Sequence, residues 1–281
     1  MAEWTETCRG TVAPWECDTT EHFTIAYYLD RVEQASATIA ERLGLAEHLR
    51  AGVFPRRFTL RFMRELRAGA SFQVESAAFG SEPALRLGHR FVDSASGDPV
   101  TWIEEVWETA PLTEFERETV GRNRADWDGP AIEDRPEPRS TEGSIPSARG
   151  RVKPADLDEF DRLSLAAFVH RFTDAVIQAS AAIGITDDYM KTERRGYSTF
   201  ELSLKIGAAP GVGDPYLVET GIAHLGSSSI RFLHRMTDPR SGREFARLGQ
   251  FGVQLDLDAR RPAPLPDHVR ERAAALLLPP G

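Results

Sequence analysis

The sequence predicts an α+β fold built from two tandem copies of one unit, each with a long helix and an antiparallel sheet. The first reason is a repeat, because residues 9–45 align without gaps with residues 149–185. The second is that strand-like segments in each copy follow one another through short turns instead of alternating with helices. The third is a stretch dense in Pro, Gly, Ser and charge at 121–148, which has the composition of a linker. We expect the first repeat at 1–120 and the second at 149–281.

The repeat keeps its register over a strand, an acidic loop and a helix. RGTVAPWECD at 9–18 corresponds to RGRVKPADLD at 149–158, so Asp18 and Asp158 lie 140 residues apart. Further along, LGHRFVD at 87–93 corresponds to FLHRMTD at 232–238, after a small insertion. A chance match would rarely hold a loop, a helix and its terminal glycine in one register, which indicates a tandem duplication.

One amphipathic helix is expected near the start of each copy. Apolar residues recur there at steps of three and four, which gives a single apolar stripe. The stripe consists of Ile25, Leu29, Val32, Ala35, Ile39 and Leu43 in the first copy and of Leu165, Val169, Phe172, Val176, Ala179 and Ile183 in the second. Gly44 and Gly184 follow the stripes and are typical of residues that end a helix.

Four strand-like segments follow each helix. They are 57–63, 71–79, 85–93 and 100–109 in the first copy and 199–206, 216–225, 229–236 and 245–257 in the second. Together with a strand ahead of the helix, each unit should hold one strand, one long helix and then four strands.

Composition limits the classes of function. The formal net charge is −9, from 34 basic and 43 acidic residues, and basic residues form doublets rather than a stripe, so we expect no nucleic-acid partner. No run approaches the roughly 18 apolar residues that cross a membrane, and the N-terminal segment has no signal pattern. We expect a cytoplasmic protein without a membrane partner. No histidine pair has the spacing of a zinc site, so no metal is expected.

The segment around the first helix resembles a known family. Trp15, Asp18, His22 and Tyr28 fit the frame Trp-x-x-Asp-x-x-Gly-His-x-x-x-x-x-Tyr, apart from the glycine. FMRELRAG at 62–69 resembles the family's aromatic-x-x-Glu-x-x-x-Gly segment, and LDLDARRPAPLPDHVR at 255–270 resembles the end of its double members. The sequence is similar to the hotdog-fold acyl-CoA thioesterases of the 4-hydroxybenzoyl-CoA thioesterase-like group, in the thioesterase-like superfamily.

The resemblance implies a curved antiparallel sheet that wraps a central helix. Hotdog units work in pairs with ligand sites between them, so the two copies would form an intramolecular pseudo-dimer; further assembly into a homo-oligomer stays open. The implied activity is hydrolysis of an acyl-thioester, with acyl-CoA or an acyl carrier protein as the substrate. Coenzyme A or phosphopantetheine then enters as part of the substrate, and no separate cofactor is expected.

The frame places a candidate catalytic site in the first copy. Thioester hydrolysis needs a base or nucleophile and a place for the developing oxyanion. Asp18 can supply the first, and the unpaired N–H groups at the start of the following helix can supply the second. His22 can orient Asp18 or a water molecule, or donate to the carbonyl. The alternatives are that Asp18 only caps the helix and that His22 is an ordinary satisfied or exposed histidine.

The chain departs from the family frame at a few positions. Glu21 stands where the family has glycine, which puts close approach of a ligand to this backbone in doubt. In the second copy Asp161 and Arg162 replace Gly and His, so the first copy is the expected working site. Further substrate-contacting candidates in the two frames are Thr24, Tyr28 and Asp158. The alternative for Tyr28 is a place in the core.

Two further sets of candidates lie on strands. Glu201 belongs to a segment that paired units can bring toward the partner's helix start, so it is a catalytic candidate that would face Asp18. The alternative is a strand-edge glutamate in solvent. For the phosphates of coenzyme A, the candidates are two matching pairs on corresponding strands, His89, Arg90, His234 and Arg235.

Two other functions stay open. A double-hotdog dehydratase or hydratase also uses Asp and His on thioesters, although its Asp-x-Asn-x-x-His motif is absent here. A non-catalytic acyl-thioester binding protein would keep the fold and lose hydrolysis. Glu21 and the altered second copy favour this last alternative.

Overall fold

The chain divides into two compact units. The computed structural model describes residues 4–18, 20–80, 84–108, 112–131 and 135–281. The first unit holds residues 1–131 together with 157–167, and the second holds residues 132–156 together with 168–281. Residues 157–167, which include the acidic loop of the second copy, therefore belong to the first unit, although in the sequence repeat they are part of the second copy.

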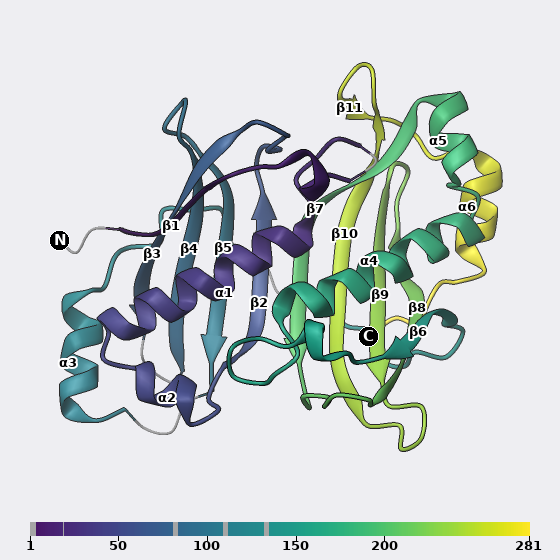
Figure 1. The fold of residues 1–281 in the computed structure, drawn as a ribbon. Helices are drawn as coiled ribbons and strands as arrows, with labels where there is room; N and C mark the ends of the chain where they lie inside the picture. The colour runs from purple at the N-terminus through teal and green to yellow at the C-terminus, as the bar shows by residue number, and fades with distance from the viewer. Residues whose placement is uncertain (1–3, 19, 81–83, 109–111, 132–134) are drawn as a thin grey trace. The chain divides into compact units, whose positions relative to one another are not determined.

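The first unit is an antiparallel sheet with one long helix lying across a face of it (Figure 1). Its strands are β1 (Thr5–Thr11), β2 (Pro55–Phe62), β3 (Ser71–Gly80), β4 (Leu85–Asp93) and β5 (Pro99–Trp107). They lie in the order β1–β3–β4–β5–β2. Its helices are η1 (Pro14–Glu16), α1 (Ile25–Arg42), α2 (Ala46–Arg50) and α3 (Glu114–Arg122).

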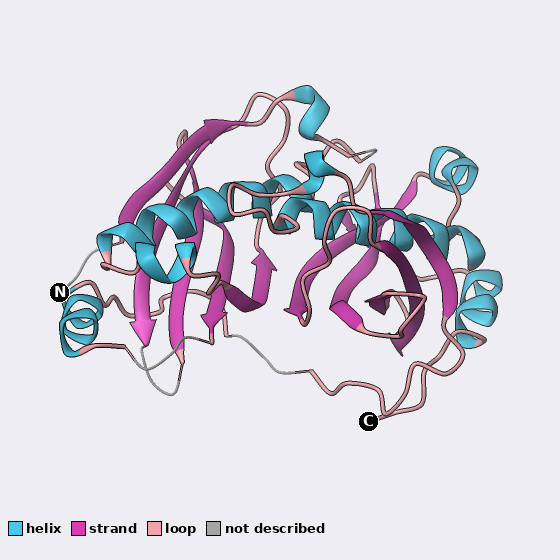
Figure 2. Ribbon diagram, turned by 60° about the horizontal axis from the view of Figure 1, so that its bottom comes forward, coloured by secondary structure: helices cyan, strands magenta, loops and turns pink. Residues whose placement is uncertain are grey.

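The second unit repeats this plan. Its strands are β6 (Ile145–Arg151), β7 (Arg195–Ile206), β8 (Pro215–Leu225), β9 (Ser229–Thr237), β10 (Glu244–Asp256) and β11 (Arg261–Pro262). The sheet order is β7–β10–β9–β8–β6, and β11 pairs with β10. Its helices are η2 (Pro154–Asp156), α4 (Leu165–Ala182), α5 (Asp187–Glu193) and α6 (Asp267–Ala274). Figure 2 shows α4, like α1 in its own unit, on one side of the strands.

The predicted fold class is confirmed, since each unit holds one strand, one long helix and then four strands in the predicted order. Thr109, at the end of one predicted strand, lies outside the described residues. The short helices α2, α3, α5 and α6 were not predicted, because helices of five to nine residues are too short to show an apolar stripe. None of the helices in the described part of the chain is long and apolar enough to cross a membrane.

The two long helices end where glycine permits it. Gly44 has φ 76° and Gly184 has φ 100°, both in the left-handed region that side chains with a Cβ seldom adopt. The predicted helix ends are therefore confirmed. On α1 the stripe residues Leu29, Val32 and Ala35 are fully buried against the sheet.

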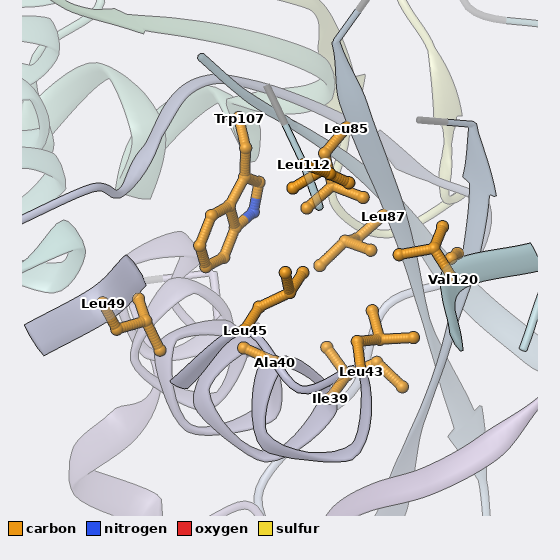
Figure 3. Packing of buried hydrophobic residues seen from close by; sticks show 11 residues of the cluster. Ile39, Ala40, Leu43, Leu45, Leu49, Leu85, Leu87, Trp107, Leu112 and Val120 are labelled. Carbon is orange, nitrogen blue, oxygen red and sulfur yellow. The ribbon is translucent and has the colours of Figure 1, made fainter. Parts of the chain in front are cut away.

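The end of α1 builds part of the first unit's core. Figure 3 shows side chains of α1 and the turn after it pointing toward those of β4 and β5, with Trp107 as the largest of them. This cluster consists of Ile39, Ala40, Leu43, Leu45, Leu49, Ala78, Leu85, Leu87, Trp107, Leu112 and Val120. Burial of this apolar surface holds α1 in place and thereby fixes where its first turn lies.

The stretch predicted as a linker is packed onto the units at both of its ends. Trp127 packs edge-on against Trp102 and at a tilt against Phe79 of the first unit, with ring centroids 5.2 Å apart in both pairs. In the second unit Glu137 forms ion pairs with Lys205 and Arg247. The Pro- and Gly-rich composition thus describes an irregular backbone, while its aromatic and charged side chains attach it to the sheets.

Candidate active site

A tight loop precedes α1 in the first unit. Cys17 and Phe23 form an isolated antiparallel bridge, and Asp18 N donates to His22 O at 2.9 Å. The loop is tied to the helix start because Thr24 N donates to Glu16 O at 2.9 Å. These main-chain bonds hold the acid and the histidine of the predicted frame immediately in front of the helix.

Asp18 organises this loop with one carboxylate oxygen. Its Oδ1 accepts from Thr20 N at 2.8 Å, from Thr20 Oγ1 at 2.6 Å and from His22 N at 3.1 Å. The residue is exposed. The alternative that Asp18 caps the helix is wrong, because α1 begins at Ile25 and its N-cap is Thr24. Asp18 therefore presents an accessible carboxylate that a rigid loop orients.

The start of α1 has open backbone donors. The N-cap residue Thr24 makes no side-chain cap bond, and Tyr27 N donates to Thr24 O. Within the described part of the chain, no hydrogen bond reaches the N–H of Ile25 or of Ala26. Ala26 is 0% exposed, whereas Ile25 is partly exposed. The N–H of Ile25, at the positive end of the helix dipole, is therefore the donor that a developing oxyanion can reach.

His22 is buried and joins the loop to a second segment. Its Nδ1 lies 3.0 Å from Thr20 Oγ1, and its Nε2 lies 2.8 Å from Glu65 Oε2. Thr20 thus connects the histidine to Asp18. Glu65 was not among the predicted site residues, although it is the acid of the FMRELRAG segment, whose resemblance to the family was the available signal.

Tyr28 lies in the core. It is 2% exposed, and its ring packs against Phe23, Phe62 and Phe91. Burial raises the pKa of its hydroxyl far above the ordinary value. This placement fits the core alternative for Tyr28 rather than contact with a substrate.

The second copy carries the same loop with different chemistry. Asp158 Oδ1 accepts from Phe160 N at 2.8 Å and from Arg162 N at 2.9 Å, and Asp158 N donates to Arg162 O. In place of the histidine, Arg162 Nε donates to Asp158 Oδ2 at 2.8 Å. The carboxylate of Asp158 is therefore paired with a guanidinium inside its own loop.

The position of the missing glycine has a left-handed backbone in both loops. Glu21 has φ 66° and Asp161 has φ 57°. Glycine is the residue that adopts this conformation without a steric cost, which explains the glycine in the family frame. Both loops keep the conformation with an acidic residue instead, and the Glu21 side chain is exposed.

Glu201 is held by an ion pair in the second unit. Its two carboxylate oxygens lie 2.9 and 3.0 Å from Nε and Nη2 of Arg135, and Arg135 also lies over the ring of Phe251. The side chain is 4% exposed, so the alternative of a solvent-exposed strand-edge glutamate is wrong. A carboxylate in a bidentate pair with arginine is a poor base, which argues against the predicted catalytic role.

The predicted phosphate-binding histidines lie inside the units. His89 and His234 are 0% exposed and bond to Ser76 Oγ and Thr220 Oγ1, each at 2.7 Å. Burial lowers the pKa of His234 to about 3, so this imidazole is neutral. Neither side chain is placed to meet a phosphate in solvent.

The adjacent arginines lie on the opposite sheet faces and are already paired. Arg90 bonds to Glu75 and Asp128 and lies over the ring of Trp4. Arg235 Nε lies 2.7 Å from Glu244 Oε2. Binding of a phosphate by these guanidinium groups would have to displace those carboxylates.

Comparison with known proteins shows what the chain is similar to. Residues 152–273 match the family model described as the thioesterase-like superfamily. The matched range is the second copy, whereas the Asp18–His22 frame lies in the first. A search of curated protein sequences found no match.

Solved structures resemble both copies of the chain. An acyl-ACP thioesterase from Bacteroides thetaiotaomicron is 12% identical with a TM-score of 0.67, over 88% of this chain and 96% of that one. A protein from Lactobacillus plantarum described as an oleoyl thioesterase is 13% identical with a TM-score of 0.68, over 94% and 98%. A 12:0-ACP thioesterase from Umbellularia californica is 13% identical with a TM-score of 0.62, over 88% and 93%. At this identity the likeness shows the double-hotdog fold.

Proposed function

We propose that this protein hydrolyses acyl thioesters and releases a carboxylic acid from acyl-CoA or from an acyl carrier protein. The observation that carries the proposal is the exposed, loop-oriented carboxylate of Asp18 ahead of a helix whose first N–H, that of the partly exposed Ile25, has no hydrogen-bond partner in the described part of the chain. The superfamily match and the thioesterases with the same fold support the same reaction class. Water is the only other reactant, so no cofactor is needed, and coenzyme A or phosphopantetheine forms part of the substrate.

Asp18 has two ways to open the thioester. As a general base it takes a proton from water, whose oxygen attacks the carbonyl carbon, and the proton then passes to the departing thiolate. As a nucleophile its carboxylate attacks the carbonyl carbon and expels the thiolate, which leaves an anhydride that water hydrolyses. In both routes the carbonyl oxygen becomes negative, and the N–H group of Ile25 is the donor proposed to stabilise it.

The test is a thiol-release assay on a panel of acyl-CoA substrates with wild type and Asp18→Asn. We expect release by the wild type and a loss of about 100-fold or more in the variant, the size typical of removing a base or nucleophile. Equal release by both proteins would contradict the role of Asp18. A change in enoyl absorbance without thiol release would instead support a dehydratase, and binding of substrate without either signal would support a non-catalytic protein.

Labelled water separates the two routes. In a single turnover in ¹⁸O-water, a nucleophilic carboxylate takes up the label when its anhydride is hydrolysed at the aspartyl carbon, and mass spectrometry of the peptide that holds Asp18 detects it. A general base leaves the peptide unlabelled and puts the label only in the released acid. The predicted cytoplasmic location stays a prediction.

A further inference from the structure

Glu65 lies in a segment that is fastened to the Asp18 loop. The segment connects β2 and β3, and its Leu66 O accepts from Phe23 N at 2.8 Å, one residue after His22. Nearby, Gly69 N donates to Val12 O at 2.9 Å, with Gly69 at φ 87°. The main chain therefore fixes the distance between the carboxylate of Glu65 and the ring of His22.

The hydrogen-bond partners of His22 can accept a hydrogen bond from each ring nitrogen. Thr20 Oγ1 has one hydrogen, and the close contact with Asp18 Oδ1, at 2.6 Å, uses it. The same hydroxyl then accepts from Nδ1–H of His22 at 3.0 Å. The other nitrogen, Nε2, faces a carboxylate oxygen of Glu65 at 2.8 Å, and an ionised carboxylate only accepts. A ring that donates from both nitrogens is an imidazolium.

The second copy supports a cation at this position. Arg162 corresponds to His22, and its permanently charged guanidinium pairs with the loop aspartate, Asp158, directly. The residue that corresponds to Glu65 is Ala209, because Gly213 N donates to Val152 O as Gly69 N donates to Val12 O. The additional acid, Glu65, is thus present in the first copy, which has a histidine at this position, and absent from the second copy, which has an arginine.

We propose that Glu65 is a positioning residue that keeps His22 as an imidazolium and thereby holds Asp18 as an oriented, ionised carboxylate. This inference rests on the proposed function for its catalytic consequence. The charged groups around the ring are Asp18 and the exposed Glu21 on its own loop, and Glu65 and Arg67 on the facing segment. Arg67 lies 3.7 Å from Glu65 Oε2 and is 45% exposed, so it competes weakly with His22.

This arrangement assigns different roles to the two frame residues. An imidazolium has no lone pair to accept a proton, so His22 is not the base, and its two N–H groups are already used by Thr20 of the loop and by Glu65 of the facing segment. Thr20 Oγ1 links this positive charge to Oδ1 of Asp18. Asp18 is then the group that reacts, and Glu65 acts on the reaction only through His22.

The experiment combines nitrogen-15 NMR of the histidine rings with thioester hydrolysis at pH 7. His22→Gln identifies the ring signals of His22. We expect the imidazolium pattern for His22 in the wild type and the neutral pattern in Glu65→Gln, with kcat lowered about 10- to 100-fold and KM nearly unchanged, the size of one charge-assisted hydrogen bond. Glu65→Asp should restore part of both signals, and Glu118→Gln, an exposed acid on α3, should change neither.

A His22 ring spectrum that is the same in wild type and Glu65→Gln overturns the proposal, whatever the activity. The ring spectrum does not depend on turnover. If the wild type hydrolyses no thioester, the proposed function fails, and the spectra of wild type, Glu65→Gln and Glu65→Asp alone decide on the role of Glu65. Thermal unfolding of each variant checks that a changed spectrum comes from the folded protein.

Discussion

Glu33 of α1 accepts a hydrogen bond from the backbone N–H of Leu165, the first residue of α4, with 2.9 Å between Oε1 and N. A further N–H of the first turn, that of Ala167, donates to Ser164 Oγ at 3.1 Å. The start of α4 is thus capped by side chains, whereas Ile25 and Ala26 at the start of α1 keep open donors. The two copies share a loop, but only the first combines a reactive carboxylate with a free helix start.

This difference predicts unequal effects of the two matching aspartate variants. Asp158→Asn should keep thioester hydrolysis within about twofold of the wild type, because its carboxylate is paired with Arg162 and the adjacent helix start is occupied by Glu33. Asp18→Asn should lose it by about 100-fold or more. The two changes remove corresponding loop acceptors, so each serves as the structural control for the other. A large loss in Asp158→Asn with normal thermal unfolding would show that the second copy also takes part.

Glu33 should make the stability of the protein fall as pH rises. The pKa of this carboxyl is raised to about 8, chiefly by burial. The Leu165 N–H and Arg162 lower it, and the charges of Asp158 and Asp30 raise it. A raised folded-state pKa gives a contribution that is complete below the unfolded value of 4.5 and is lost as pH rises through about 8. We expect Glu33→Gln to become more stable than the wild type over this window, by an amount on the order of 3 kcal/mol at pH 9.

Urea unfolding at pH 5, 7 and 9 measures this difference. The same series on Glu41→Gln, an exposed acid near the end of α1, should give a difference that does not change with pH. A constant difference between Glu33→Gln and the wild type across the series would mean that Glu33 titrates as an ordinary exposed acid.

The left-handed backbone of Glu21 predicts a stabilising substitution. Glu21→Gly should raise the free energy of unfolding by about 0.5–1 kcal/mol, because glycine adopts φ 66° without a steric cost while losing somewhat more chain entropy. Glu41→Gly makes the same chemical change in right-handed helix and should destabilise by about 1 kcal/mol. Thermal unfolding compares the two. A lower melting temperature for Glu21→Gly would indicate that the Glu21 side chain stabilises the loop more than its backbone strains it.

The periodic parts of the chain could be predicted from the sequence. The apolar stripes and their terminal glycines marked both long helices, and the duplication showed that the two loops would share one geometry. These features depend on neighbours a few residues apart, and such neighbours are visible in a sequence. The order of the elements along the chain and the fold class could be predicted from the repeat and from the strand-like segments.

The partners of the site residues could not be predicted in the same way. Glu65 meets His22 from a segment some forty residues away, and Glu33 lies on the polar side of a helix stripe, where an acid normally faces solvent. The sequence already argued against His89 and Arg90 as joint ligands of one phosphate. Adjacent residues of a strand point to opposite faces of the sheet, so one of the two had to face the core.

A buried acid under α1 carries the last prediction. Glu105 is 0% exposed and accepts from Ser36 Oγ of α1 at 2.5 Å and from Trp107 Nε1 at 2.9 Å, with His89 Nε2 3.4 Å away. In the second copy the corresponding residue is Gln250. Glu105→Ala should cost about 3–5 kcal/mol, because it leaves the two buried donors, Ser36 Oγ and Trp107 Nε1, without an acceptor. Glu105→Gln keeps one acceptor oxygen and the shape of the side chain, so it should cost about half as much. Urea unfolding of both variants measures the two losses, and equal losses would mean that the volume of the side chain, rather than its hydrogen bonds, is what the helix requires.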